Sequence, residues 1–247
     1  MMMAYDFRAQ RLFVDFPLAA DAVVEPGRAQ VHYLIHVLRL KAGDAILVFN
    51  GCDGEWRATL REAGRKSCKL DIEEQIRAQP DPPDLDFLFA PLKQARLDYM
   101  VQKAVEMGAG RLIPVRTQFT QIGRINTDRM RANAIEAAEQ CGLLNLPEFA
   151  PLERLDKIVT GWDPAWRLIF CDEAAPVADP LAALKAVPVG PLAVLIGPEG
   201  GFSADERARL LDLPHVTVLS LGPRILRADT AAVAALAVVQ ATIGDWR

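Results

Sequence analysis

Short apolar runs separated by Gly, Pro and Asp indicate strands in the first third of the chain. Four such runs have the length and bounding residues of strands and cover 11–14, 45–49, 55–60 and 67–72. The segment 50–54 (NGCDG) between two of them predicts a tight turn. The apolar spacing over 28–39 predicts one amphipathic helix. A small β-barrel or a curled sheet is the natural closure for these strands.

Beyond residue 84, buried strands alternate with helices. Strands are predicted at 86–90, 112–115, 167–171, 192–196 and 216–219. Helices are predicted at 94–107, 127–141, 178–186, 204–212 and 229–242. This alternation is typical of an α/β domain, in which crossover helices connect the strands of a parallel sheet.

A proline-rich segment lies between the two patterns. Residues 78–84 (AQPDPPD) contain three prolines within four positions, so neither a helix nor a central strand can pass through them. We therefore expect two domains, a β-rich domain over 1–75 and an α/β domain over 85–247, joined by a linker over 76–84.

Composition adds that this is an ordinary globular chain. Its 247 residues are 51% apolar and 24% charged, which excludes a disordered chain, a collagen-like fibre and a disulfide scaffold. Residues 1–10 contain Asp6 and Arg8 and no apolar core of a secretory signal. The apolar run 231–239 is far shorter than the ~20 residues of a membrane span. A cytoplasmic protein without a membrane segment is expected.

The net charge of −4 hides an uneven distribution. Residues 91–131 contain eight basic and three acidic side chains, whereas 132–190 contain four basic and nine acidic ones. A smaller basic cluster is interrupted only by Glu62 and consists of Arg57, Arg61, Arg65, Lys66 and Lys69. Segregated positive charge can steer a polyanion such as RNA. Solvated helix faces are the other explanation for the same pattern.

Several classes of site find little support. The cysteines form no CxxC pair, so reduced and mostly buried thiols are expected at 52, 68, 141 and 171. His32 and His36 have the spacing of two metal ligands on a helix, but Tyr33 stands where HExxH needs Glu, and no third ligand is evident. No metal site is expected. The chain also lacks the GxSxG of a serine hydrolase.

The strongest chemical signal is the segment Ile196–Phe202 (IGPEGGF). It follows an apolar strand and precedes Ser203–Glu206, a capping box that opens a helix. A loop with three glycines can bring bare backbone amides close to a ligand, and ligands of open α/β sheets bind at the carboxyl ends of strands. The sequence is neither a GxGxxG loop nor a P-loop. A tight turn without a ligand is the alternative.

A second segment, Ser220–Ala231 (SLGPRILRADTA), lies between another strand and the last helix. Gly222-Pro223 forces a turn, and Asp229 or Thr230 is expected to cap the helix. Because each of the two segments closes an adjacent strand, we expect them to share one pocket.

These two segments resemble the signature loops of the ribosomal small-subunit RNA methyltransferase E family. The resemblance extends over nearly the whole chain in the right order. It includes His32–Asp44 (HYLIHVLRLKAGD), Gln102–Gly108 (QKAVEMG), Ile113-Pro114 and Glu136–Gln140 (EAAEQ). The chain departs from the family at Leu143, where an arginine is usual, and at 117–120 (TQFT), where many members have an acidic residue, Arg and Ser.

The resemblance implies a SPOUT-type α/β domain whose C-terminal segment threads a trefoil knot, preceded by a PUA-like β-barrel that binds RNA. It also implies a homodimeric enzyme that takes S-adenosylmethionine as cofactor. The implied reaction is methylation of N3 of a specific uridine in 16S rRNA of the small ribosomal subunit. Two alternatives stay open: a SPOUT methyltransferase acting on another RNA position, such as tRNA or a ribose 2′-oxygen, and a non-catalytic RNA-binding assembly factor, which would not need a cofactor pocket.

Site residues follow from placing this reaction on the two loops. Arg227 would stabilise the developing uracil anion or anchor a phosphate. Glu199 would act as a base, orient a water or brace its loop. RNA contacts are expected at Arg11, Arg39, Lys93 and Arg116. The expected cofactor contacts are Ile196, Gly197, Pro198, Glu199, Gly200, Gly201, Leu219, Ser220, Leu221, Gly222, Arg224, Ile225, Leu226 and Thr230.

Overall fold

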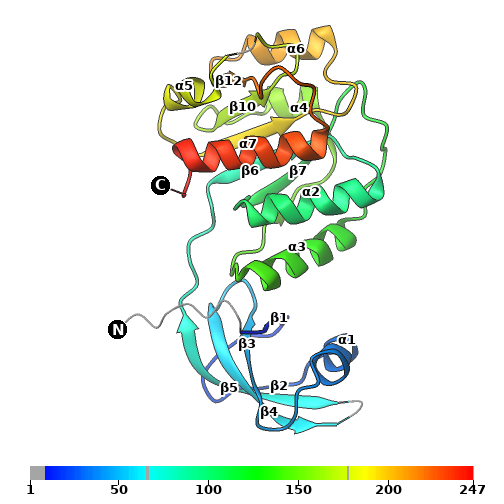
Figure 1. Ribbon diagram of the computed structural model, residues 1–247, viewed down its shortest axis with the longest axis vertical. Helices are drawn as coiled ribbons and strands as arrows, with labels where there is room; N and C mark the ends of the chain where they lie inside the picture. The colour runs from blue at the N-terminus through cyan, green and yellow to red at the C-terminus, as the bar shows by residue number, and fades with distance from the viewer. Residues whose placement is uncertain (1–8, 65–66, 177, 247) are drawn as a thin grey trace. The chain divides into compact units, whose positions relative to one another are not determined.

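The computed structural model describes residues 9–64, 67–176 and 178–246, which group into two units (Figure 1). The first unit comprises the chain up to Pro82 together with Ala138–Leu146, and the second comprises the rest. Arg65 and Lys66 of the basic cluster, and residues 1–8 at the N-terminus, lie outside the described residues. Among the described helices, none has the length and apolar character that crossing a membrane requires.

The first unit is built on a five-stranded sheet with the strand order β1-β3-β4-β5-β2. β1 pairs in parallel with β3, and the other neighbours are antiparallel. The helix expected over 28–39 is α1 (Arg28–His32) continued by the π-helical turn η1 (Tyr33–Val37). The strands are β1 (Arg11–Phe13), β2 (Val23–Val24), β3 (Ala45–Phe49), β4 (Glu55–Ala63) and β5 (Cys68–Arg77).

The β4–β5 pair is longer than its apolar pattern suggests. The pairing register shifts at three places along β4, and such irregularities bend and twist a two-stranded ribbon. β5 continues to Arg77, two residues into the predicted linker 76–84. The apolar core of this sheet contains Leu34, Val48, Leu60 and Leu70, all fully buried.

A buried ion pair lies at the start of the same sheet. The Glu55 carboxylate, 1% exposed, accepts from Arg11 Nε at 2.9 Å and from Arg77 Nε at 2.7 Å. Arg77 also donates to the carbonyl of Gly142 at 2.9 Å. Glu55 therefore joins β1, β4, β5 and the segment that follows α3 within this unit.

The second unit contains a seven-stranded sheet. Its order is β12-β10-β11-β6-β7-β8, with β9 also paired to β7, and every pair is parallel. All five residues of β6 and of β11 are buried, as expected for strands covered on both faces. The strands are β6 (Leu85–Phe89), β7 (Arg111–Arg116), β8 (Glu148–Phe149), β9 (Glu153–Arg154), β10 (Arg167–Cys171), β11 (Leu192–Ile196) and β12 (Val216–Leu219).

Helices cover both faces of this sheet (Figure 1). α2 and α5 pack against α7, and α7 packs on β11. α4 and α6 contact each other and share a core with alternate residues of the strands, including Leu88, Phe170 and Leu195. The parallel α/β arrangement expected from the sequence is confirmed. The helices are α2 (Gln94–Glu106), α4 (Leu155–Thr160), α5 (Pro180–Lys185), α6 (Ala204–Leu211) and α7 (Ala228–Ile243). A further helix, α3 (Thr127–Cys141), begins in this unit, and its residues from Ala138 onward belong to the first unit.

The cysteines only partly follow the expectation of buried thiols. Cys68 and Cys171 are buried, whereas Cys52 and Cys141 are exposed. Cys52 lies in the 50–54 turn and Cys141 in the last turn of α3. At these surface positions a small side chain gains little stability from apolar burial.

We predict that Glu55→Ala destabilises the first unit by about 3–5 kcal/mol, because it removes the carboxylate that Arg11 and Arg77 share in a buried setting. Urea unfolding followed by circular dichroism measures the change. The matched control is Glu74→Ala, which breaks an exposed pair with Arg57 and is expected to cost less than about 1 kcal/mol. Equal effects of the two substitutions would contradict the prediction.

Candidate functional site

Three loops meet at one edge of the parallel sheet because of the strand order. β11 and β12 both pair in parallel with β10, one on each side of it. The strands that the two glycine-bearing loops close are therefore not adjacent, and the expectation that they are is wrong. The loops still meet, because parallel strands end at the same edge, and the loop after β10 lies between them.

The three loops line a cavity of about 390 Å³. Of the residues expected at the cofactor, the cavity brings together Ile196, Gly197, Pro198, Glu199, Gly200, Leu219, Ser220, Leu221, Gly222, Arg224, Ile225 and Leu226. Gly201, Thr230 and Arg227 are not among its lining residues. Sequence reasoning missed the contribution of the loop after β10, which supplies Cys171, Asp172, Glu173 and Ala175. The acidic pair Asp172-Glu173, directly after the apolar run of β10, is the sequence signal that could have indicated this loop.

Close packing fixes the loop after β11. A Cβ at Gly197 would lie 2.5 Å from Cε2 of Phe202, whose ring packs edge-on against Phe170. A Cβ at Gly201 would collide with the Glu173 carboxylate, and Gly201 has a φ of +67°. The Gly201 amide donates to the Pro198 carbonyl at 2.9 Å. Glycine is thus required here by the turn itself as well as for access of a ligand to the backbone.

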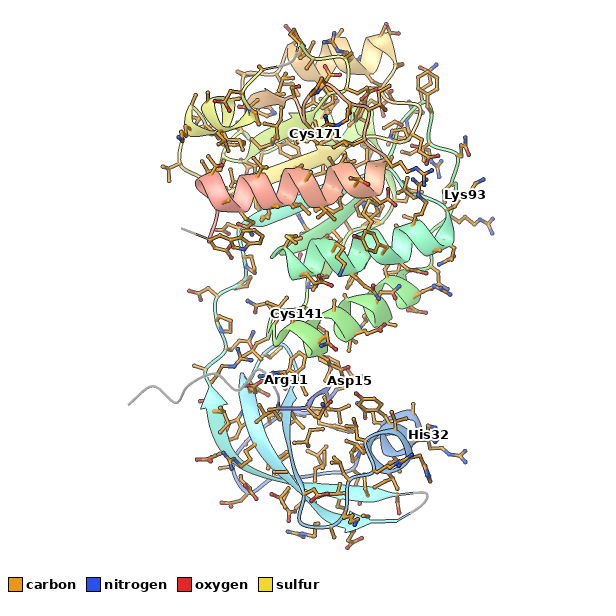
Figure 2. The ribbon with its side chains drawn as sticks, viewed as in Figure 1. Arg11, Asp15, His32, Lys93, Cys141 and Cys171 are labelled. Carbon is orange, nitrogen blue, oxygen red and sulfur yellow. The ribbon has the colours of Figure 1, made fainter. Side chains whose placement is uncertain are left out.

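The loop after β10 is attached to α6. The buried Asp172 carboxylate accepts from Arg207 Nε at 2.7 Å and from the Ala174 amide at 3.0 Å. Cys171, at the end of β10 (Figure 2), is buried, and burial raises the pKa of its thiol to about 12. The thiol therefore stays protonated at neutral pH and is a wall of the cavity rather than a nucleophile.

Arg96, in the first turn of α2, connects the two glycine-bearing loops. It pairs with Glu199 of the loop after β11 and, at 3.2 Å, with Asp229 in the first turn of α7. The two carboxylates, Glu199 above all, raise the pKa of Arg96. Of the three roles considered for Glu199, bracing the loop is the one that this ion pair performs. The sequence placed Arg96 only in a basic stretch.

The start of α7 differs from the expectation. Arg227, not Asp229 or Thr230, occupies the N-cap position, and its side chain makes no capping bond. Asp229 lies one position inside the first turn, where its carboxylate meets Arg96 and also accepts from the Thr230 amide at 3.1 Å. Arg227 is exposed between Leu226 and Ala228, both of which line the cavity.

The residues expected to bind RNA have different surroundings. The Arg11 side chain (Figure 2) is only 3% exposed, and its guanidinium pairs with Glu55 inside the first unit. The expectation that Arg11 contacts RNA is therefore wrong. Arg39 is exposed with a φ of +58°. Lys93 is exposed at the start of α2 (Figure 2), and Arg116 is exposed and donates to the Gly123 carbonyl at 3.0 Å.

Internal ion pairs take up much of the basic stretch 91–131. Four of its side chains pair with carboxylates: Arg96, Lys103, Arg111 and Arg129. Among the described residues, Lys93 and Arg124 form no ion pair. The smaller basic cluster is paired as well, since Arg57, Arg61 and Lys69 each lie within 4 Å of an acidic side chain. The net positive charge thus overstates the surface available to a polyanion.

A second cavity, of about 630 Å³, lies between the end of β7, α4 and α6. Some of its charged side chains have local partners: Arg154 pairs with Asp156, and Glu206 caps α6. We assign the ligand site to the smaller cavity, where bare glycine backbone from two loops faces the space. Within 9–64, 67–176 and 178–246, no group of three or more His, Cys, Asp or Glu side chains could hold a metal ion.

Family models match both units of the chain. A model described as an RNA methyltransferase domain matches residues 79–240, and one described as an RNA methyltransferase PUA domain matches residues 26–73. The parallel α/β sheet with its three-loop cavity, preceded by a PUA domain, is thereby that of the RNA methyltransferases.

Individual relatives indicate which kind of RNA methyltransferase this chain is similar to. A Synechocystis protein named Ribosomal RNA small subunit methyltransferase E is 30% identical to this chain, over 95% of this chain and 78% of the relative. A Rickettsia conorii protein of the same name is 29% identical, over 93% of this chain and 94% of the relative. A solved structure of that name from Neisseria gonorrhoeae, bound to S-adenosyl methionine, matches with a TM-score of 0.85 at 22% identity over 97% of this chain and 100% of the other. The chain belongs to the ribosomal RNA small subunit methyltransferase E family.

We predict that Arg96→Ala loosens the loop after β11 without unfolding the protein, because the loop loses its ion pair to α2. Amide hydrogen exchange of residues 197–201 and 228–230 is expected to become faster, while Tm changes little. Arg129→Ala, which removes an exposed pair with Asp98 between α2 and α3, is the control. Unchanged exchange at 197–201 would show that Arg96 does not hold the loop.

Proposed function

We propose that this chain transfers the methyl group of S-adenosylmethionine to N3 of a specific uridine in 16S rRNA. The observation that carries the proposal is the cavity that three loops of an RNA methyltransferase domain line at the carboxyl edge of the sheet. Its volume of about 390 Å³ is within the range of small-molecule sites. A Legionella pneumophila protein, 27% identical over 95% of this chain and 98% of that one with a TM-score of 0.79, was solved in complex with the cofactor SAM.

The cofactor supplies an electrophilic methyl group on a sulfonium. The uracil N3–H is a weakly acidic imide between two carbonyls, so loss of its proton places negative charge on O2 and O4. As the N3–C bond forms, the S–C bond breaks and the N3 proton leaves to a base or to water. The protein must therefore align the two reactants and stabilise the developing anion.

The residues of the cavity divide this work. The backbone of 196–200 and 219–226 holds the cofactor, with Gly201 shaping the turn beside it. Arg227, exposed at the end of the second loop, stabilises the uracil anion or anchors a phosphate next to it. Glu199 acts through its ion pair with Arg96, which keeps both loops in place.

RNA is bound through exposed basic side chains that form no ion pair among the described residues. They include Arg39 in the first unit and Lys93, Arg116 and Arg124 in the second. Arg11 is left out of this surface because it is buried against Glu55. The family resemblance further supports a homodimer in the cytoplasm and a C-terminal segment threaded into a trefoil knot.

The reaction is tested by incubating the protein with S-adenosylmethionine and small ribosomal subunits that lack the modification, followed by nucleoside analysis. We expect 3-methyluridine in the 16S rRNA. A different methylated nucleoside would move the target to another RNA position. No methylated product, with no binding of S-adenosylmethionine, would favour the non-catalytic assembly factor.

We predict that Arg227→Ala lowers kcat by about 10²–10³-fold, the usual effect of removing one donor to a developing anion. Calorimetry is expected to give an unchanged affinity for S-adenosylmethionine, because Arg227 does not line the cavity. Arg209→Ala on α6 serves as a control for the loss of one exposed positive charge in the same unit. Turnover of Arg227→Ala equal to that of the control would remove Arg227 from the reaction.

A further inference from the structure

Phe119 is an exposed aromatic residue in an otherwise well-held loop. It follows β7, and 44% of its surface is exposed. The turn around it is closed by Thr117 and Thr120: the Thr117 amide donates to Thr120 Oγ1 at 2.9 Å, and the Thr120 amide donates to the Thr117 carbonyl at 3.2 Å. The exposure of the ring is therefore a property of an ordered turn.

The same turn is attached to the helix that follows the glycine loop. The Gln118 amide donates to Glu206 Oε1 at 2.8 Å. The other oxygen of Glu206 accepts from the Ser203 amide at 3.0 Å, as part of the capping box of α6. One carboxylate thus fixes the loop after β7 relative to the loop after β11.

This arrangement puts Phe119 next to Gly200 at the rim of the cavity. A Cβ at Gly200 would lie 3.2 Å from Cβ of Phe119 and 3.6 Å from its Cγ. Gly200 lines the cavity. An apolar ring of this size gains stability from burial, yet here it stays partly in water beside a site that the protein leaves open.

We propose that Phe119 is the platform on which the target base stacks during methyl transfer; this inference rests on the proposed function. A base that reacts at N3 must leave its Watson–Crick partner, and proteins hold such unstacked RNA bases on aromatic side chains. Stacking engages the face of the ring and leaves the N3 edge free to meet the methyl group. Phe119 offers such a face at the rim, next to the glycine loop.

Three substitutions separate stacking from packing. Phe119→Ala removes the side chain, Phe119→Leu keeps apolar contact with Gly200 but has no aromatic face, and Phe119→Tyr keeps the face. With unmethylated small subunits as substrate, we expect kcat/KM to fall about 5- to 150-fold for Ala and Leu and to stay near the original value for Tyr. Leu211→Ala, which trims another apolar side chain of similar exposure (42%), is the control.

Two further measurements accompany the kinetics for each variant. Calorimetry is expected to give the original affinity for S-adenosylmethionine, and sedimentation is expected to give the original oligomeric state. The proposal is overturned if Ala and Leu turn over like Leu211→Ala, if Leu restores what Ala loses, or if the loss is accompanied by a changed oligomeric state. Failure of the unsubstituted protein to methylate would instead overturn the proposed function.

Discussion

The parallel pairing of β11 and β12 with β10 is the constraint on which the site depends. In the pairing register, Cys171 at the end of β10 is opposite Ile196 on one side and Leu219 on the other, so the three strands end at the same level. The loops that follow these strands therefore all lie at the same edge of the sheet. The cavity follows from that alignment.

Ordering three loops at one edge of a sheet costs conformational entropy, so stabilising contacts must offset that cost. The loops use three kinds: ring packing against Gly197, the buried Asp172–Arg207 pair, and the Arg96 bridge from Glu199 to Asp229. The ion pairs connect the loops to helices α6, α2 and α7, whereas the Phe202 ring packs its own loop against Phe170 of β10. Helix α2 packs against α7, and α6 packs against α4 and β12. The loops that line the cavity are therefore held in a defined arrangement, which favours ligand binding by reducing the cost of ordering.

Elements with long apolar patterns were predictable from the sequence, and contacts between distant residues were not. β3, β10, β11 and β12 have the bounds that their apolar runs predict, whereas β2, β8 and β9 are too short to leave a pattern. The sequence predicted the two glycine-bearing loops but not the loop after β10, because the periodicity of apolar residues does not reveal the order of strands in a sheet. Arg11 and Arg96 have the same side chain, and their partners decide their roles. Arg11 has a structural role because it pairs with the buried Glu55, whereas Arg96 belongs to the site because it pairs with Glu199.

The central claim, that these three loops form the cofactor site, is tested most directly by amide hydrogen exchange with and without S-adenosylmethionine. We expect slower exchange in 171–175, 196–201 and 219–226, and no change around the second cavity at 154–160 and 205–213. Protection confined to the second cavity, or no protection at all at saturating S-adenosylmethionine, would contradict the account.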